Sequence, residues 1–230
     1  MDEILTPAFL TGFFTIIGID VILSGDNAVV IALAARSLPE AQQKRAVFWG
    51  AGAAVALRVM LAAVAVQLLR LPYLKLAGGF LLLWIAVKLL LPESEEADVA
   101  PADHLWAAIK TIVVADFVMS LDNVVAVAAA AHGSVLLLAL GLIISIPLVV
   151  FGASLLMKLM ERWPSIITIG AAILGWTALE MAVTDAIVEP FLHGIPPLAH
   201  YAFPAAGALF VVLTGKWFAA RAASRHAGVV

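Results

Sequence analysis

The chain has 230 residues, of which 64% are hydrophobic and only 13% are charged, and its formal net charge is -3. An ordinary soluble domain is about 45–50% apolar and about 25% charged, and a chain of this length could not bury so much apolar surface in a water-facing fold. The composition therefore excludes a soluble enzyme, and the slightly acidic balance excludes a nucleic-acid partner. The sequence contains no cysteine, which excludes disulfide scaffolds, thiolate zinc sites and cysteine nucleophiles. The class that remains is a polytopic membrane protein.

Seven apolar stretches are long enough to cross a bilayer as helices, which takes roughly 20 mostly apolar residues. They are Ala8–Ala35, Ala46–Leu69, Tyr73–Leu91, Leu105–Ala131, Ser134–Met157, Ser165–Asp185 and Ala199–Phe218. The first stretch follows two acidic residues and itself contains two aspartates, so we interpret it as a membrane helix and not as a cleavable signal. The sequence therefore predicts an all-α membrane protein with seven transmembrane helices.

The connections between these stretches are short, except for the acidic segment Pro92–His104. We interpret this segment as a solvated linker between two halves of the protein, with a metal-attracting loop as the alternative. Lysine and arginine gather in the loops that share a side with the C-terminal tail. The positive-inside rule then predicts a cytoplasmic C-terminus and an N-terminus on the outside of the membrane.

Two segments 96 residues apart, residues 20–27 and 116–123, share the pattern D-x-x-x-S-x-D-N. A second match aligns residues 78–88 with residues 170–180 at an offset of 92. Helices one to three thus repeat as helices four to six, and the seventh helix is extra. Because three is an odd number, the two repeats enter the membrane with opposite polarity, an architecture that recurs in transporters. The predicted parts are residues 1–91 (first repeat), 92–104 (linker), 105–187 (second, inverted repeat) and 188–230 (seventh helix and cytoplasmic tail).

Each copy of the motif places two aspartates near the middle of a membrane helix: Asp20 and Asp26 in the first copy, Asp116 and Asp122 in the second. A charge at the bilayer centre costs about 2.5–3.5 kcal/mol on insertion scales, so these carboxylates need compensation. Oxygen ligands without cysteine or nearby histidine suit a hard divalent cation such as Mn²⁺, Mg²⁺ or Ca²⁺. The structural alternative is that the acids pair with Arg58 or cap a broken helix.

The spacing of the acids favours a break in the first helix. Asp26 lies about 120° around the helix from Asp20, so an unbroken helix could not direct both carboxylates at one ion. The Ser24–Gly25 pair offers a place for a break, because glycine tolerates unusual backbone angles and serine bonds to backbone groups. A break would also free backbone carbonyls for a cation. The second motif has leucine instead of glycine after Ser120, which weakens the case for a matching break.

Three further residues are candidates for supporting roles. Arg58 balances part of the charge, because four carboxylates, one guanidinium and one divalent ion leave -1, which a shared proton would neutralise. Protons and metal would then compete for the same oxygens, the simplest route to metal/proton antiport. Met119 could add a thioether that favours Mn²⁺, although core packing is the commoner role. Glu180 either lines an exit path or is a satisfied structural acid.

The chain resembles the TerC family of bacterial integral membrane proteins, and in particular its YjbE-type branch, in residues 18–28, 115–124 and 72–79. That family was named for tellurium resistance and is placed in the LysE-like transporter group. The resemblance implies metal ion homeostasis in the cytoplasmic membrane, with Mn²⁺ efflux as the leading activity. It would assign metal-site roles to Asp20, Asp26, Asn27, Asp116, Asp122 and Asn123.

The leading hypothesis is a non-enzymatic divalent-cation exporter, with Mn²⁺ as the first choice of ion, Ca²⁺ or Mg²⁺ as alternatives, and protons as the expected coupling ion. Asn27 and Asn123 would contribute neutral oxygens or hold the carboxylates, with Ser24 and Ser120 in support. A non-transporting accessory protein, which senses the metal and helps to metallate or insert other proteins, would use the same site. An intramembrane aspartyl protease, which needs two membrane-buried aspartates sharing a proton, is the minor alternative. The expected partners are the lipid bilayer, metal ions and protons, and a homo-oligomer is left open.

Overall fold

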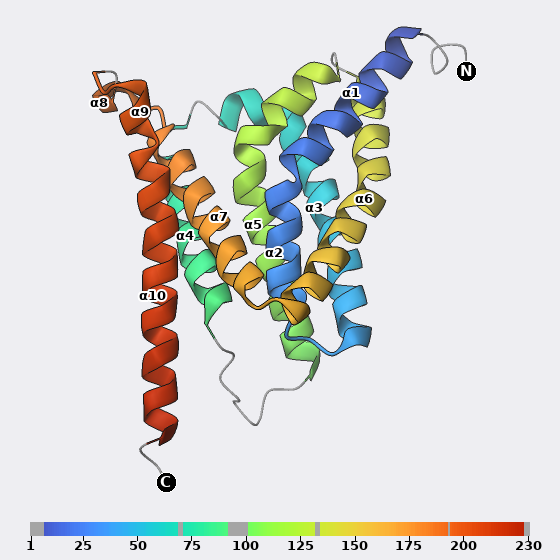
Figure 1. Ribbon diagram of the computed structural model, residues 1–230. Helices are drawn as coiled ribbons and strands as arrows, with labels where there is room; N and C mark the ends of the chain where they lie inside the picture. The colour runs from blue at the N-terminus through green and yellow to red at the C-terminus, as the bar shows by residue number, and fades with distance from the viewer. Residues whose placement is uncertain (1–6, 69–70, 92–100, 132–133, 193, 228–230) are drawn as a thin grey trace. The chain divides into compact units, whose positions relative to one another are not determined.

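The computed structural model describes residues 7–68, 71–91, 101–131, 134–192 and 194–227. These described residues form ten α-helices and no β-strand, which confirms the all-α prediction. The helices are α1 (Pro7–Leu23), α2 (Gly25–Ala35), α3 (Glu40–Leu68), α4 (Leu74–Leu90), α5 (Pro101–Ala130), α6 (Val135–Arg162), α7 (Ser165–Val183), α8 (Glu189–Leu192), α9 (Pro197–His200) and α10 (Ala202–Ala227) (Figure 1). Each predicted apolar stretch coincides with one long helix or, for the first stretch, with the pair α1 and α2.

Length and composition make α3, α5, α6 and α7 candidates to cross a membrane. The pair α1 and α2 makes a fifth candidate, bent by 52° at the break between the two helices. The 17 residues of α4 and the apolar part of α10, Ala202–Phe218, lie at the short end of the roughly 17–25 residues that span a bilayer. Seven crossings, and the sides on which the termini lie, stay predictions.

Two boundaries differ from the sequence prediction. The first turn of α5 includes residues 101–104, which the sequence prediction places in the acidic linker, and residues 92–100 of that linker lie outside the described residues. Proline suits the first position of a helix, because the N–H that it lacks would have no helical partner there. At the other end of the chain, α10 continues to Ala227, beyond the predicted limit at Phe218.

The helices form two compact units. Unit 1 comprises residues 1–71 and 101–158 and so contains α1, α2, α3, α5 and most of α6. Unit 2 comprises residues 72–100 and 159–230 and contains α4 and α7 to α10. Each unit thus takes helices from both halves of the sequence. Two of the three pairs of predicted equivalents are in contact within their unit: α1 and α2 with α5 in unit 1, and α4 with α7 in unit 2.

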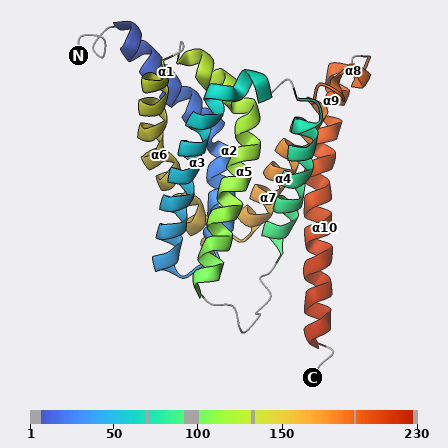
Figure 2. The ribbon, with the colours of Figure 1, turned by 180° about the vertical axis from the view of Figure 1, so that it is seen from behind.

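In unit 1, α5 packs against α1, α2 and α3, and Figure 2 shows α3 and α5 side by side. Their close approach depends on Gly50 of α3, where an added Cβ would lie 2.9 Å from side-chain atoms of Ile112. Every residue of α2 from Asn27 to Ala35 is buried, as expected of a helix that is apolar on most of its faces. The first motif therefore ends inside the core of unit 1.

In unit 2, the start of α4 is held by Asp185, which is 1% exposed and lies in the turn just beyond α7. Its carboxylate accepts hydrogen bonds from the backbone N–H groups of Tyr73 (3.2 Å), Leu76 (3.1 Å) and Ile187 (3.0 Å). Asp185 thus caps the N-terminus of α4 from another part of the chain. Burial opposes ionisation of this carboxyl, but the backbone donors at Ile187, Leu76 and Tyr73 outweigh it and hold the pKa of Asp185 below its usual value.

Candidate functional site

The first motif contains the break between α1 and α2. Ser24, between the two helices, has φ -98° and ψ 7°, in the bridge region of backbone space. A continuous helix would bond the carbonyl of Leu23 to the N–H of Asn27. At the break, the N–H of Asn27 donates to the Asp26 carboxylate (2.9 Å). The Leu23 carbonyl instead accepts a hydrogen bond from Nδ2 of Asn123 on α5 (3.4 Å). The predicted break at this position is confirmed.

The second motif lies on α5, which runs without a break from Pro101 to Ala130. Leu121 stands where the first motif has glycine, and its side chain is buried with 2% exposure. Leucine favours a helix interior by roughly 1 kcal/mol over glycine, and its burial adds the packing of a large apolar side chain. The residue after the motif serine is thus glycine where the helix is broken and leucine where it is continuous.

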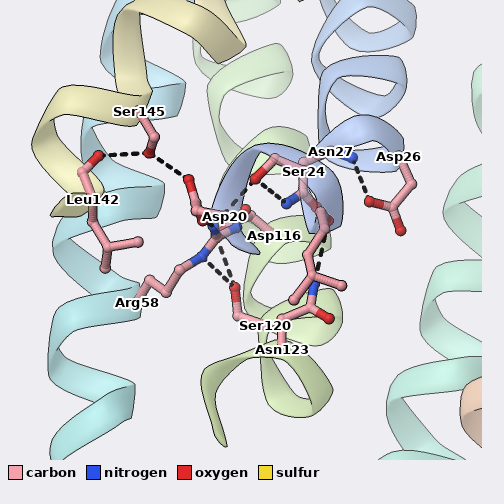
Figure 3. Close-up of polar contacts among 11 residues, drawn as sticks. Asp20, Ser24, Asp26, Asn27, Arg58, Asp116, Ser120, Asn123, Leu142 and Ser145 are labelled. Atoms are coloured by element: carbon pink, nitrogen blue, oxygen red, sulfur yellow. Dashed lines mark hydrogen bonds and ion pairs between the residues drawn. The ribbon is translucent and has the colours of Figure 1, made fainter. Parts of the chain in front are cut away.

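Asp20 on α1, Asp116 on α5 and Arg58 on α3 form a buried ion-pair cluster (Figure 3). The guanidinium of Arg58 donates from Nη1 to Oδ1 of Asp20, and from Nη2 to Oδ1 of Asp116 at 2.6 Å. The three residues are 1%, 7% and 4% exposed in the order Asp20, Asp116, Arg58. Pairing with Arg58, which the sequence raised as the structural alternative, is what the structure shows for these two acids.

Two serines of the motifs complete the surroundings of the guanidinium. Ser120 accepts a hydrogen bond from Nε of Arg58 (3.1 Å) and donates to Oδ2 of Asp116 (3.1 Å). Ser24 accepts from Nη1 of Arg58 at 3.4 Å. Both serines are at most 3% exposed. The aspartate-to-serine spacing that the two copies share thus serves the cluster directly, because the serine lies one helical turn after the aspartate.

Ser145 on α6 is a member of the cluster that sequence reasoning missed. Its hydroxyl is fully buried and bonds to Oδ2 of Asp20 and to the carbonyl of Leu142 (2.8 Å). A hydroxyl has one proton, so these two acceptors share a single donor. Ser145 belongs to no repeat and no motif, and no pattern in the sequence marks it.

A cavity of about 20 Å³ lies beside the cluster, large enough for one water-sized group. Asp20, Asp116, Arg58, Ser24 and Asn27 form its polar lining. Its apolar wall is formed by Ile31, Ala51, Ala54, Val55, Ile146 and Val149. The side-chain oxygen of Asn27, a residue only 3% exposed, has no hydrogen-bond partner among the described residues. A buried polar group left in this state costs about 1–3 kcal/mol, so a donor or a cation that reached this oxygen would be favourable.

The second aspartate of each motif lies outside the cluster, which corrects the expectation that four carboxylates meet. Asp26 is in the first turn of α2, half-buried, and Figure 3 shows its carboxylate apart from the guanidinium of Arg58. Asp122 lies on an exposed face of α5. The physical reason on α5 is the six-residue spacing, which turns Asp122 about 120° away from Asp116 on a continuous helix. Within the part of the chain that the structure describes, no three acidic or histidine side chains gather closely enough to hold a metal ion.

The remaining predicted residues have structural partners. The side-chain N–H of Asn123 on α5 donates to the Leu23 carbonyl and so stabilises the break between α1 and α2. Met119 is 3% exposed and belongs to the apolar core, in keeping with the packing role. Glu180 lies on α7 in unit 2, where its carboxylate accepts a hydrogen bond from Nε1 of Trp176 (3.1 Å).

Residues 5–223 match the family described as Integral membrane protein TerC family. The chain is 43% identical over 188 residues to the uncharacterized membrane protein YjbE of Bacillus subtilis, a match that covers 81% of this chain and 86% of YjbE. It is 26% identical over 220 residues to the uncharacterized membrane protein YkoY of the same bacterium, covering 84% of this chain and 68% of YkoY. It is 30% identical over 217 residues to YegH of Escherichia coli, covering 85% of this chain but 40% of YegH. No solved structure matches the chain.

Proposed function

We propose that this chain, which belongs to the TerC family of integral membrane proteins, transports a divalent cation, with Mn²⁺ as the leading substrate and export from the cytoplasm as the direction. One observation carries the proposal: two residues with buried carboxylates, Asp20 and Asp116, line the same small cavity in unit 1 as Asn27, whose side-chain oxygen has no partner among the described residues. Such oxygen groups suit Mn²⁺, Mg²⁺ or Ca²⁺. Ionisable groups inside membrane helices commonly mark an ion pathway.

In this proposal Asp20 and Asp116 are the charged ligands and the side-chain oxygen of Asn27 is a neutral one. They lie on α1, α5 and α2, and the break at Ser24 lets the α1 carboxylate and the α2 amide face one cavity. The hydroxyls of Ser24 and Ser120, which belong to the ion-pair cluster, could supply further oxygen ligands. The ligand set is thus assembled from both copies of the motif.

Asp26 and Asp122 keep a proposed role on the path of the ion. Both are more accessible than the clustered aspartates, so an ion meets them before it reaches the buried carboxylates. We expect Asp26→Asn and Asp122→Asn to slow transport with a smaller effect on the equilibrium affinity for Mn²⁺. Protons are the proposed coupling ion, because the carboxylate oxygens that bind a metal ion must be deprotonated to do so.

Uptake of radioactive Mn²⁺ into inverted membrane vesicles tests the proposal. Vesicles with the wild-type protein should accumulate the ion, and vesicles with Asp116→Asn should not. Asp103→Asn, an exposed change on the same helix, is the matched control and should behave as wild type. Equal accumulation by Asp116→Asn and wild type would contradict the site. Binding of Mn²⁺ by the wild type without accumulation would contradict transport and favour the accessory, metal-sensing function.

A further inference from the structure

We infer that Arg58 is an internal competitor of the transported cation: its guanidinium holds the two buried carboxylates when no ion is bound and leaves them when the ion binds. The inference rests on the proposed transport function and adds a residue that sets the affinity and charge selectivity of its site. Ion binding is then an exchange of one cation for another, and the carboxylates are at no stage left without a counter-ion.

The first step of the argument is geometric. The planar guanidinium lies between Asp20 and Asp116, with one Nη nitrogen on an Oδ1 oxygen of each. The remaining Oδ2 oxygens accept from the hydroxyls of Ser145 and Ser120. All four carboxylate oxygens are therefore engaged, and the two that face each other across the cluster are engaged by a cation.

The second step is electrostatic. A divalent cation would take carboxylate oxygens at about 2.0–2.6 Å, while Nη2 of Arg58 already lies 2.6 Å from Oδ1 of Asp116. Two cations on the same pair of buried carboxylates would repel each other strongly, because the surroundings screen charge weakly. The guanidinium and the metal ion therefore exclude each other from these oxygens.

The third step is the charge balance of the cluster. Two carboxylates and one guanidinium sum to -1. On the two carboxylates themselves, a divalent ion would supply the full +2, whereas a monovalent ion would supply no more charge than the guanidinium and would forfeit the five-donor fork of the arginine. A doubly charged ion therefore competes with Arg58 for these carboxylates better than Na⁺ or K⁺ does, and the displaced guanidinium keeps its own +1 charge.

The side-chain oxygen of Asn27 distinguishes the groups that would bind the metal ion from the groups that bind Arg58. Asn27 lines the same cavity, yet neither Arg58 nor another donor among the described residues bonds to its side-chain oxygen. The guanidinium satisfies the carboxylates and the hydroxyls but leaves this oxygen open. A cation in the cavity would gain an oxygen ligand that the arginine does not use, which gives the exchange a local driving force.

Calorimetric titration of the purified protein with Mn²⁺ tests the inference. Arg58→Ala should bind Mn²⁺ about tenfold more tightly or better than wild type, because the internal competitor is gone. Arg45→Ala, an exposed arginine on the same helix, is the matched control and should bind as wild type. Added guanidinium ion, at millimolar levels far below denaturing concentrations, should weaken Mn²⁺ binding to Arg58→Ala competitively. Urea, which has a similar shape and no charge, should not.

Weaker or equal binding of Mn²⁺ by Arg58→Ala would overturn the inference. Stronger binding of Mn²⁺ by this variant when guanidinium is added would also overturn it. Either result would mean that Arg58 organises the ligands and does not compete for them. If Arg58→Ala does not fold, Arg58→Lys is tested in its place, because the single ammonium group of lysine cannot bind both carboxylates as the guanidinium does. We expect this variant too to bind Mn²⁺ more tightly than wild type. If its affinity for Mn²⁺ is not higher than that of wild type, the inference is overturned. Absence of Mn²⁺ binding in wild type and both variants would reject the proposed function itself.

Discussion

The two copies of the D-x-x-x-S-x-D-N motif share four identical residues and do different work. In the first copy the helix breaks at Ser24, and in the second copy α5 continues through Ser120. Asn123 of the continuous copy donates to the carbonyl that the break exposes in the broken copy. On α5 the corresponding carbonyl belongs to a continuous helix, so the side-chain N–H of Asn27 has no matching exposed carbonyl and donates to Ser24 at 3.5 Å instead. The side-chain oxygen of Asn27 has no partner among the described residues. The two asparagines, equivalent in sequence, thus have different surroundings: Asn123 supports the break, and Asn27 is the proposed ligand.

The largest effect that sharpens this comparison is expected from Leu121→Gly, which gives the second copy the glycine of the first. Removing a fully buried leucine costs about 2–5 kcal/mol, and glycine in a helix interior adds roughly 1 kcal/mol. We therefore expect the free energy of unfolding in detergent to fall by about 3–6 kcal/mol. A loss below about 1 kcal/mol would show that the continuity of α5 does not depend on this side chain.

Asp185 offers a contrast to the motif aspartates, because its buried carboxylate is fixed by backbone N–H groups and not by a guanidinium. Asp185→Asn should lower the stability at pH 7 by about 2 kcal/mol, since bonds to a charged acceptor are lost. The pKa of Asp185 is lowered in the folded protein, so its stabilisation is full above the unfolded pKa of about 3.9 and is lost as the pH falls through the folded value.

Thermal unfolding of wild type and Asp185→Asn between neutral and acidic pH measures both effects. The difference between the two proteins should shrink as the pH falls below about 4. Mn²⁺ affinity should be the same in both proteins, because Asp185 lies in unit 2 and outside the cluster. A stability difference that stays constant down to acid pH would contradict the role of the ionised carboxylate.

The two motif asparagines should separate stability from binding. Asn123→Ala leaves the Leu23 carbonyl without its partner and should cost about 1–2 kcal/mol. Asn27→Ala should cost less than about 0.5 kcal/mol, because its oxygen has no partner and its Nδ2 bond to Ser24 is long at 3.5 Å. The same Asn27 variant should lose Mn²⁺ affinity. Equal losses of stability in the two variants would contradict the different roles that we assign to Asn123 and Asn27.

Gly25→Ala should have the smallest effect. An added Cβ at this position would meet no atom within 4 Å, and alanine favours helix over glycine by about 1 kcal/mol at most. We expect no loss of stability in thermal unfolding, because Asn123 and Asp26 still hold the break from either side. A clear loss would mean that glycine itself is required at the break.

Much of the fold follows from the sequence, since long apolar stretches in a chain of this composition have few alternatives to membrane helices. The break was predictable because serine and glycine interrupt the first motif while leucine continues the second. Pairing of Arg58 with the acids was predictable as an alternative, because it is a charged residue in the middle of the second apolar stretch.

Other features could not be read from the sequence. The pairing of α7 with α4 and α10 depends on close approaches at Gly79, which faces Ala178, and at Gly175, which faces Gly207. Helices that are apolar on most faces carry no periodicity that identifies a partner. The direction of the Asp26 side chain depends on the backbone path after the break, and the sequence does not define that path. Ser145 joined the cluster only through the packing of α6 beside α1.

Because each unit draws on both halves of the chain, the order of biosynthesis matters for assembly. Chains begin to fold from the N-terminal end as they emerge from the ribosome, but α4 is synthesised before α7, whose Ala178 and Ala182 lie against its Gly79. Arg58 likewise enters the membrane with Asp20 before Asp116 has been made. A nascent chain that ends at residue 91 therefore contains Arg58 with Asp20 and Asp26, and the second carboxylate of the cluster arrives with α5.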